Sequence, residues 1–153
     1  MVTPHTVTVV SFHDGVPYLT VLRGVMLQGM SGKTVLRNGE MDETKAVLYI
    51  PFSVDAQNPA GERTSFLLPR AFASCPDPEL HWTLQPEGES AGRCGFFVKD
   101  ILDTPLTLAE ARRIYDEVYI IAGYSVRDYG SAAMRHYEVR SKISSRYYGT
   151  GLN

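Results

Sequence analysis

Two β-rich runs in the last third of the chain constrain the fold most strongly. Residues 117–126 and 134–140 are rich in β-branched and aromatic side chains, which favour strands. The short polar segment between them contains Asp128 and Gly130, residue types that favour turns. This arrangement predicts a long β-hairpin. A chain that ends in this way is expected to form a small, β-rich body.

The rest of the chain adds further strands. β-branched or alternating apolar residues predict strands at residues 5–12, 17–23, 46–52, 82–84 and 96–101. A turn at His13–Gly15 joins the first two. A break or bulge is expected at Gly24, after which the second strand continues.

Residues 53–80 have a different character. Prolines and turn residues interrupt the segment, which predicts a long inserted loop with short ordered pieces, including about one helical turn around residues 69–72. Loops of this length are usually functional or ordered by a partner. The segment is not a disordered linker, because it carries apolar side chains. The side chains predicted to contact a neighbouring subunit or partner here are Phe66, Leu67, Leu68 and Phe72.

One helix is predicted at about residues 105–116. Thr107 and Glu110 match a capping box, in which the threonine side chain accepts the third amide and the glutamate reaches back. The apolar residues that then share one helix face are Leu108, Ala111, Ile114 and Tyr115.

These elements predict a single domain over residues 1–153. The fold class is mainly β: a small β-barrel or β-sandwich with one packed α-helix at about 105–116, an inserted loop at about 53–80 and a C-terminal arm at 144–153. A chain of 153 residues is typical of one domain. Its hydrophobic fraction of 44% is sufficient for a core.

Charge and targeting signals narrow the possible functions. The formal net charge of −2 provides no global basic field for nucleic acid, although basic residues gather at Arg135, Arg140, Lys142 and Arg146. No secretory signal is visible and no apolar run approaches the roughly 20 residues of a membrane span, so we expect a protein made and kept in a cytosol. Cys75 and Cys94 are expected to be free thiols, and a bond between them is the alternative.

Catalytic motifs are sparse in this sequence. The histidines lack metal-ligand spacing. The segment Gly29–Thr34 resembles part of a phosphate-binding loop, but Leu27 stands where the first glycine is required. Cys94, beside Arg93, is a candidate nucleophile without a local signature. We therefore assign no catalytic, cofactor-binding or metal-binding residue and predict that the protein is not an enzyme, with a small Cys94-dependent enzyme or ligand-binding barrel as the alternative.

Tyrosines cluster in the C-terminal third, at Tyr119, Tyr124, Tyr129, Tyr137, Tyr147 and Tyr148. Tyrosine brings apolar area and a hydroxyl group at low entropy cost. Protein contacts are favoured over base stacking, because the chain lacks a basic field. In the C-terminal arm, Arg146, Tyr147 and Tyr148 are predicted to contact neighbouring subunits.

Several short motifs follow one another along the chain: residues 5–9, 49–53, Phe72, 82–86, 124–128 and 130–139. Together they resemble small phage and prophage proteins encoded among head and neck genes. The strand–turn–strand ending is similar to that of head-closure proteins of long-tailed phages, the stopper class.

This resemblance implies a small β-barrel present in several copies in a ring between the portal–adaptor assembly and the tail. The ring would line the channel for double-stranded DNA, without sequence specificity, and help to retain the packaged genome. The protein would be made in the bacterial host cytoplasm, reside in the virion neck and need no cofactor. The 53–80 insertion departs from the shortest stoppers, which leaves an adaptor or a tail terminator as alternatives.

Overall fold

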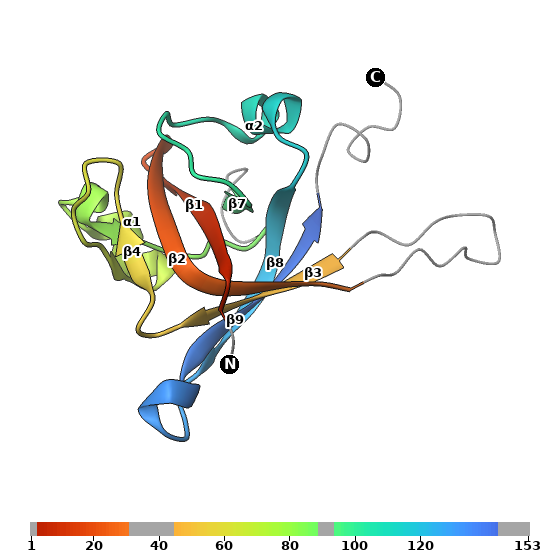
Figure 1. The fold of residues 1–153 in the computed structure, drawn as a ribbon. Helices are drawn as coiled ribbons and strands as arrows, with labels where there is room; N and C mark the ends of the chain where they lie inside the picture. Colours follow the sequence, from red (N-terminus) through yellow and green to blue (C-terminus); the bar gives the residue numbers. More distant parts are fainter. Residues whose placement is uncertain (1–2, 31–44, 89–93, 144–153) are drawn as a thin grey trace.

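The computed structural model describes residues 3–30, 45–88 and 94–143, and six of its strands close into a β-barrel (Figure 1). The sheet runs in the order β1-β7-β8-β9-β3-β2, and the pairing of β1 with β2 closes it. The barrel strands are β1 (His5–His13), β2 (Val16–Met30), β3 (Lys45–Pro51), β7 (Phe96–Val98), β8 (Val118–Arg127) and β9 (His136–Ile143). The expected mainly β fold is confirmed, and it is a barrel rather than a sandwich.

The long strand β2 makes closure possible because it pairs with two different partners. Residues 16–25 pair with β1, and residues 26–30 pair with β3. Gly24, with φ +88°, lies near the change of partner, at the point where the β1–β2 register shifts. Such a bulge bends a strand, and glycine adopts this positive φ without strain. The bulge expected at Gly24 is confirmed.

The segment 53–80 is more regular than a loop. Strand β4 (Asp55–Gln57) pairs with β2 beyond the point where β3 leaves it, and it is the extra strand of the sheet. The remaining elements of the segment and its exit are β5 (Ser65–Phe66), α1 (Pro69–Ser74), η1 (Pro78–Leu80) and β6 (His81–Trp82). The helical turn expected near residue 69 is therefore present, whereas β4 and β5 were not expected.

Two apolar clusters form the core. The larger one fills the barrel and includes Val9, Leu48 and Trp82. The smaller one lies under α2 (Leu108–Ile114) and includes Val10 and Phe96. Strand β1 contributes neighbouring residues to both clusters, which explains its continuous β-branched run.

Helix α2 is shorter than the predicted 105–116. The capping box is present, with Thr107 as the N-cap and Glu110 reaching back to it, so the helix cannot begin before residue 108. It ends at Ile114, because the C-cap residue Tyr115 has an extended backbone (φ −114°, ψ 144°) that leads toward β8. Of the predicted apolar face, Ala111 is buried but Ile114 is 62% exposed.

The predicted C-terminal hairpin is confirmed as β8 and β9. The last pair between β9 and β3 joins His136 to Pro51. Beyond this pair the hairpin extends out of the barrel, as the lower end of the molecule in Figure 1 shows. The tip of the hairpin, residues 127–135, includes η2 (Ala132–Met134).

Candidate functional site

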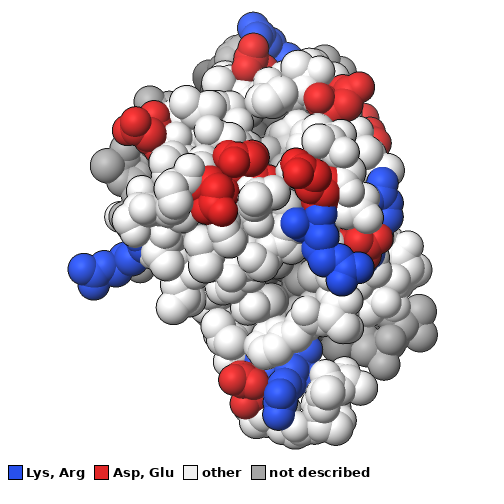
Figure 2. Space-filling view, turned by 90° about the vertical axis from the view of Figure 1, so that its left-hand side faces the viewer, with Lys and Arg blue, Asp and Glu red and all other residues white. Residues whose placement is uncertain are grey.

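The surface charge is mixed rather than basic. Figure 2 shows the side of the molecule on which α1 and β4 lie, where acidic and basic side chains are scattered without a continuous basic area among the described residues. Several cations of the C-terminal third form ion pairs with carboxylates. Arg127 Nε is 3.4 Å from Glu138 Oε2, and Arg135 Nε is 3.5 Å from Asp128 Oδ1. Lys142 Nζ is 2.6 Å from Glu87 Oε2. Two of the basic residues that cluster in the sequence, Arg135 and Lys142, are thus partly neutralised.

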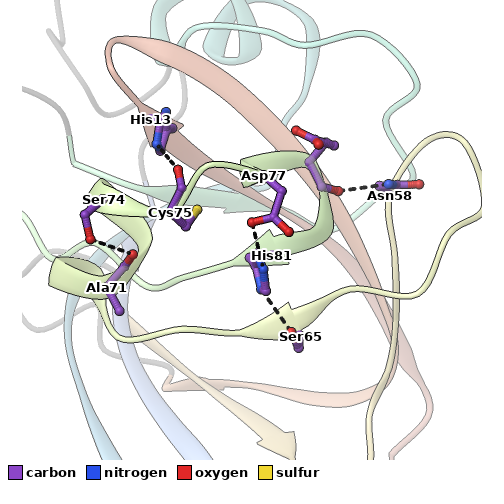
Figure 3. Close-up of polar contacts among 9 residues, drawn as sticks. His13, Asn58, Ser65, Ala71, Ser74, Cys75, Asp77 and His81 are labelled. Carbon is purple, nitrogen blue, oxygen red and sulfur yellow. Dashed lines mark hydrogen bonds and ion pairs between the residues drawn. The ribbon is translucent and has the colours of Figure 1, made fainter.

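Side-chain hydrogen bonds attach the chain after α1 to the end of β1. The Gln85 amide accepts from the Phe12 N–H and donates to the Phe12 carbonyl, both at 2.8 Å. The Ser11 hydroxyl lies 3.1 Å from the Thr83 carbonyl and 3.2 Å from its N–H. His13 Nε2 lies 3.0 Å from the Cys75 carbonyl (Figure 3). These bonds hold the end of the inserted segment and the residues that follow it on the barrel.

The four apolar residues predicted to make contacts in this segment have different environments. Phe72 is fully buried, with its ring 5.6 Å from that of His13, so its prediction as a contact residue is wrong: it anchors α1. Phe66 is half-buried and packs on Trp82 and Tyr137, with ring centroids 5.0 and 4.5 Å away. Leu67 is half-buried. Leu68, at 56% exposure, is the one with an exposed side chain.

The other predicted contact residues, Arg146, Tyr147 and Tyr148, lie with the arm 144–153 outside the described residues. Most of the glycine-rich segment Gly29–Thr34 also falls outside them. These predictions stay predictions.

A polar array that the sequence did not reveal links Ser65, His81 and Asp77 (Figure 3). Ser65 Oγ lies 3.0 Å from His81 Nδ1, and His81 Nε2 lies 3.3 Å from Asp77 Oδ1. Acyl transfer also needs N–H donors aimed at an oxyanion. The nearby N–H groups of Thr64 and Leu67 instead donate to backbone carbonyls. The array therefore works as a link between β5, η1 and β6.

The cysteines have no reactive environment among the described residues. Both are free thiols, as expected. Burial raises the pKa of the Cys94 thiol, which disfavours the nucleophilic thiolate. The contact of His13 with Cys75 is to the main-chain carbonyl, not to sulfur. Within the described ranges, no group of three or more His, Cys, Asp or Glu residues is placed to hold a metal ion.

The hairpin tip, which the sequence indicates only as a turn, exposes two large apolar side chains. Tyr129 and Met134 are 64% and 59% exposed. The tip is nonetheless ordered: Gly130 has φ +85°, and the Phe52 N–H donates to the Arg135 carbonyl at 3.1 Å. A structured, apolar projection of this kind is suited to docking.

Searches of known proteins place the chain in one family. No curated protein and no solved structure matches it. No helix in the described part of the chain is long and apolar enough to cross a membrane. A model of a protein family of unknown function, DUF6751, matches residues 2–142. The chain, matched over nearly its full length, belongs to that family.

Proposed function

We propose that this protein is a structural component of a virion neck, of the head-closure type, which assembles in several copies into a ring between the portal–adaptor assembly and the tail. The observation that carries the proposal is the β8–β9 hairpin, which extends beyond the barrel and exposes Tyr129 and Met134 at an ordered tip. A ring needs a surface on each copy that docks on a different surface of the next copy. A preformed apolar projection supplies one such surface at little entropic cost.

The surface charge supports the same function. A ring that lines a channel for passing DNA benefits from weak phosphate contacts, because tight phosphate binding opposes movement. The ion pairs Arg127–Glu138 and Arg135–Asp128 balance the charged side chains of the projecting end of the hairpin, residues 127–138. The position in the neck is supported by the order of sequence motifs, which resembles that of phage head and neck proteins, and by the strand–turn–strand ending, which is similar to that of the stopper class.

The test is assembly. The purified protein is imaged by negative stain and weighed by native mass spectrometry, alone and after mixing with portal and tail components encoded by neighbouring genes. Rings seen alone or in the mixture support the proposal, and a protein that stays monomeric in both overturns it.

Removal of residues 144–153 sharpens this test. The truncated chain is expected to keep the fold, because the barrel strands end at Ile143, and to lose ring formation. If the truncated protein still builds particles with attached tails, the arm is not a subunit contact. The ring then depends on other surfaces. A ring that binds only portal components is an adaptor, and a ring that binds only tail components is a terminator. A ring that binds both is a stopper.

A further inference from the structure

A groove of about 710 Å³ lies between the start of α1 and the outer face of the β8–β9 hairpin. Leu68 and Pro69 line it from α1 and its N-cap, and Tyr124 lines it from β8. Two arginines, Arg70 and Arg140, also line it. The groove therefore combines an apolar wall with two guanidinium groups.

The position of Arg140 in this groove depends on Gly123. The two residues pair across β8 and β9, next to the register shift in β8. A Cβ atom on Gly123 would lie 2.5 Å from Arg140 Nη2, so the glycine leaves the space that the guanidinium occupies. Arg140 Nη1 also donates to the Ser125 hydroxyl at 3.3 Å. The guanidinium thus lies across the strand, in the groove.

Neither arginine has a carboxylate partner among the described residues, in contrast to other cations of the hairpin. The acidic group nearest the groove in sequence, Glu87, beside Pro86, contacts Lys142 at 2.6 Å. Glu138, two residues before Arg140, contacts Arg127 instead. Two guanidinium groups without carboxylate partners among the described residues match carboxylates well, because each can form paired hydrogen bonds to one.

The shape of the groove favours a peptide over nucleic acid. Single-stranded nucleic acid follows an extended basic groove with stacking aromatic residues, whereas this site is walled by Leu68 and Pro69. An extended peptide with carboxylates and an apolar side chain fits both the two guanidinium groups and the apolar wall of the site.

We propose that this groove binds the acidic tract Glu40–Glu43 of a second copy of the chain. The tract has three carboxylates in four residues, with Met41 as its apolar member, and it is the densest acidic stretch of the sequence. It connects β2 to β3, outside the described residues, so every copy carries both the groove and its ligand. A groove on one copy and a tract on the next make a heterologous contact, which propagates around a ring. The choice of a second copy rests on the proposed ring.

The first experiment measures self-association by mass photometry and sedimentation velocity. The double variant Arg70→Glu/Arg140→Glu and the triple variant Glu40→Lys/Asp42→Lys/Glu43→Lys are each expected to raise the dissociation constant about tenfold or more. Combining the two sets restores opposite charges and is expected to recover most of the affinity. The control Arg23→Glu changes an exposed arginine on β2, outside the groove lining, and is expected to have little effect.

The second experiment tests the groove independently of ring formation. A fluorescein-labelled peptide of residues 37–46 is titrated into the full-length protein. Saturable, salt-sensitive binding that the Arg70→Glu/Arg140→Glu variant abolishes supports the proposal. No binding of this peptide overturns it.

The outcomes separate the two proposals. Association that none of the charge reversals affects overturns the groove contact and leaves the ring intact. A protein that never associates, even with portal and tail components, overturns the ring and with it the second-copy assignment. If the protein remains a single copy while the charge reversals change its stability, the tract occupies its own groove, which also overturns the assignment to a second copy.

Discussion

Two segments extend from the barrel, the inserted segment 53–80 and the hairpin tip at residues 127–135, and they differ in what anchors them. The inserted segment 53–80 returns to the barrel, where Phe72 is fully buried and β4 pairs with β2. The hairpin tip at residues 127–135 projects away, and its large apolar side chains, Tyr129 and Met134, are mostly exposed. The sequence of the insertion is the more irregular of the two, yet the insertion is the more firmly attached.

The difference shows that proline-rich composition does not identify a partner-binding arm. Backbone polar groups in the insertion are satisfied within the chain: the Leu67 N–H donates to the Trp82 carbonyl, and the Thr64 N–H donates to the Ala56 carbonyl. At the tip, the Met134 and Arg135 N–H groups donate to backbone carbonyls of η2 and its N-cap, but none of residues 127–135 is buried. Apolar residues in the insertion therefore stabilise the fold, and those at the tip are available to a partner.

The largest expected effect tests whether α1 belongs to the core. Phe72→Ala is expected to lower the free energy of unfolding by about 3–5 kcal/mol, because it removes a fully buried ring and leaves a cavity. The measurement is equilibrium urea unfolding. The matched control Leu68→Ala, at the exposed N-cap of the same helix, is expected to change stability by less than about 0.5 kcal/mol. Equal, small losses for both variants would show that the insertion is only loosely attached.

The next effect tests the polar attachment between Gln85 and β1. Gln85→Leu keeps the volume but leaves the Phe12 N–H and carbonyl without the amide that bonds both at 2.8 Å. We expect a loss of about 1–3 kcal/mol in urea unfolding. Gln28→Leu, at an exposed position on β2, is the control and is expected to be nearly neutral. A neutral Gln85→Leu variant would contradict the attachment.

Local patterns in the sequence predicted the elements that depend on nearby residues. The turn at Asp14–Gly15, the bulge at Gly24 and the capping box at Thr107 each follow from the chemistry of adjacent residues. The pairing of β4 with β2 could not be predicted, because residues 55–57 have too short an apolar pattern to identify a strand.

The candidate sites were less predictable than the fold. Phe72 packs against the His13 ring, and the polar array joins Ser65 to His81. Both contacts join residues that are distant in the sequence, so local patterns do not reveal them. The apolar side chains of the insertion indicated packing but not whether they pack on the same chain or on a partner. The projecting tip could not be recognised either, because its exposure depends on where β3 stops pairing with β9.

A smaller effect concerns α2, which covers the second apolar cluster. Thr107→Ala removes the N-cap hydroxyl that accepts the Glu110 N–H and is expected to cost about 1 kcal/mol in urea unfolding at neutral pH. Thr104→Ala, just before the helix, is the control and is expected to be nearly neutral.

The same helix predicts a pH dependence. Hydrogen bonds from the Thr107 N–H and hydroxyl lower the pKa of Glu110. Because the folded pKa is depressed, the stabilisation is present above the unfolded pKa of about 4 and is lost as the pH falls through the folded value. The difference between unaltered protein and Thr107→Ala should therefore shrink below about pH 4. A constant difference down to acid pH would show that the Thr107 hydroxyl does not stabilise the Glu110 carboxylate.

The smallest effect on stability is expected at the hairpin tip, where the effect on assembly should be greatest. Tyr129→Ser/Met134→Ser removes the two most exposed large apolar side chains of the tip and is expected to change the free energy of unfolding by less than about 0.5 kcal/mol. If the tip docks on the next subunit, the same variant should lose ring formation in negative stain, because apolar anchors dominate interface energies. Ile114→Ser, at a site on α2 that is 62% exposed, is the control and should still form rings.

Rings formed by the tip variant would exclude the tip as a subunit contact. A large loss of stability would instead mean that the hairpin tip, like the insertion, contributes to the folded core. The two segments would then no longer differ in how they are anchored.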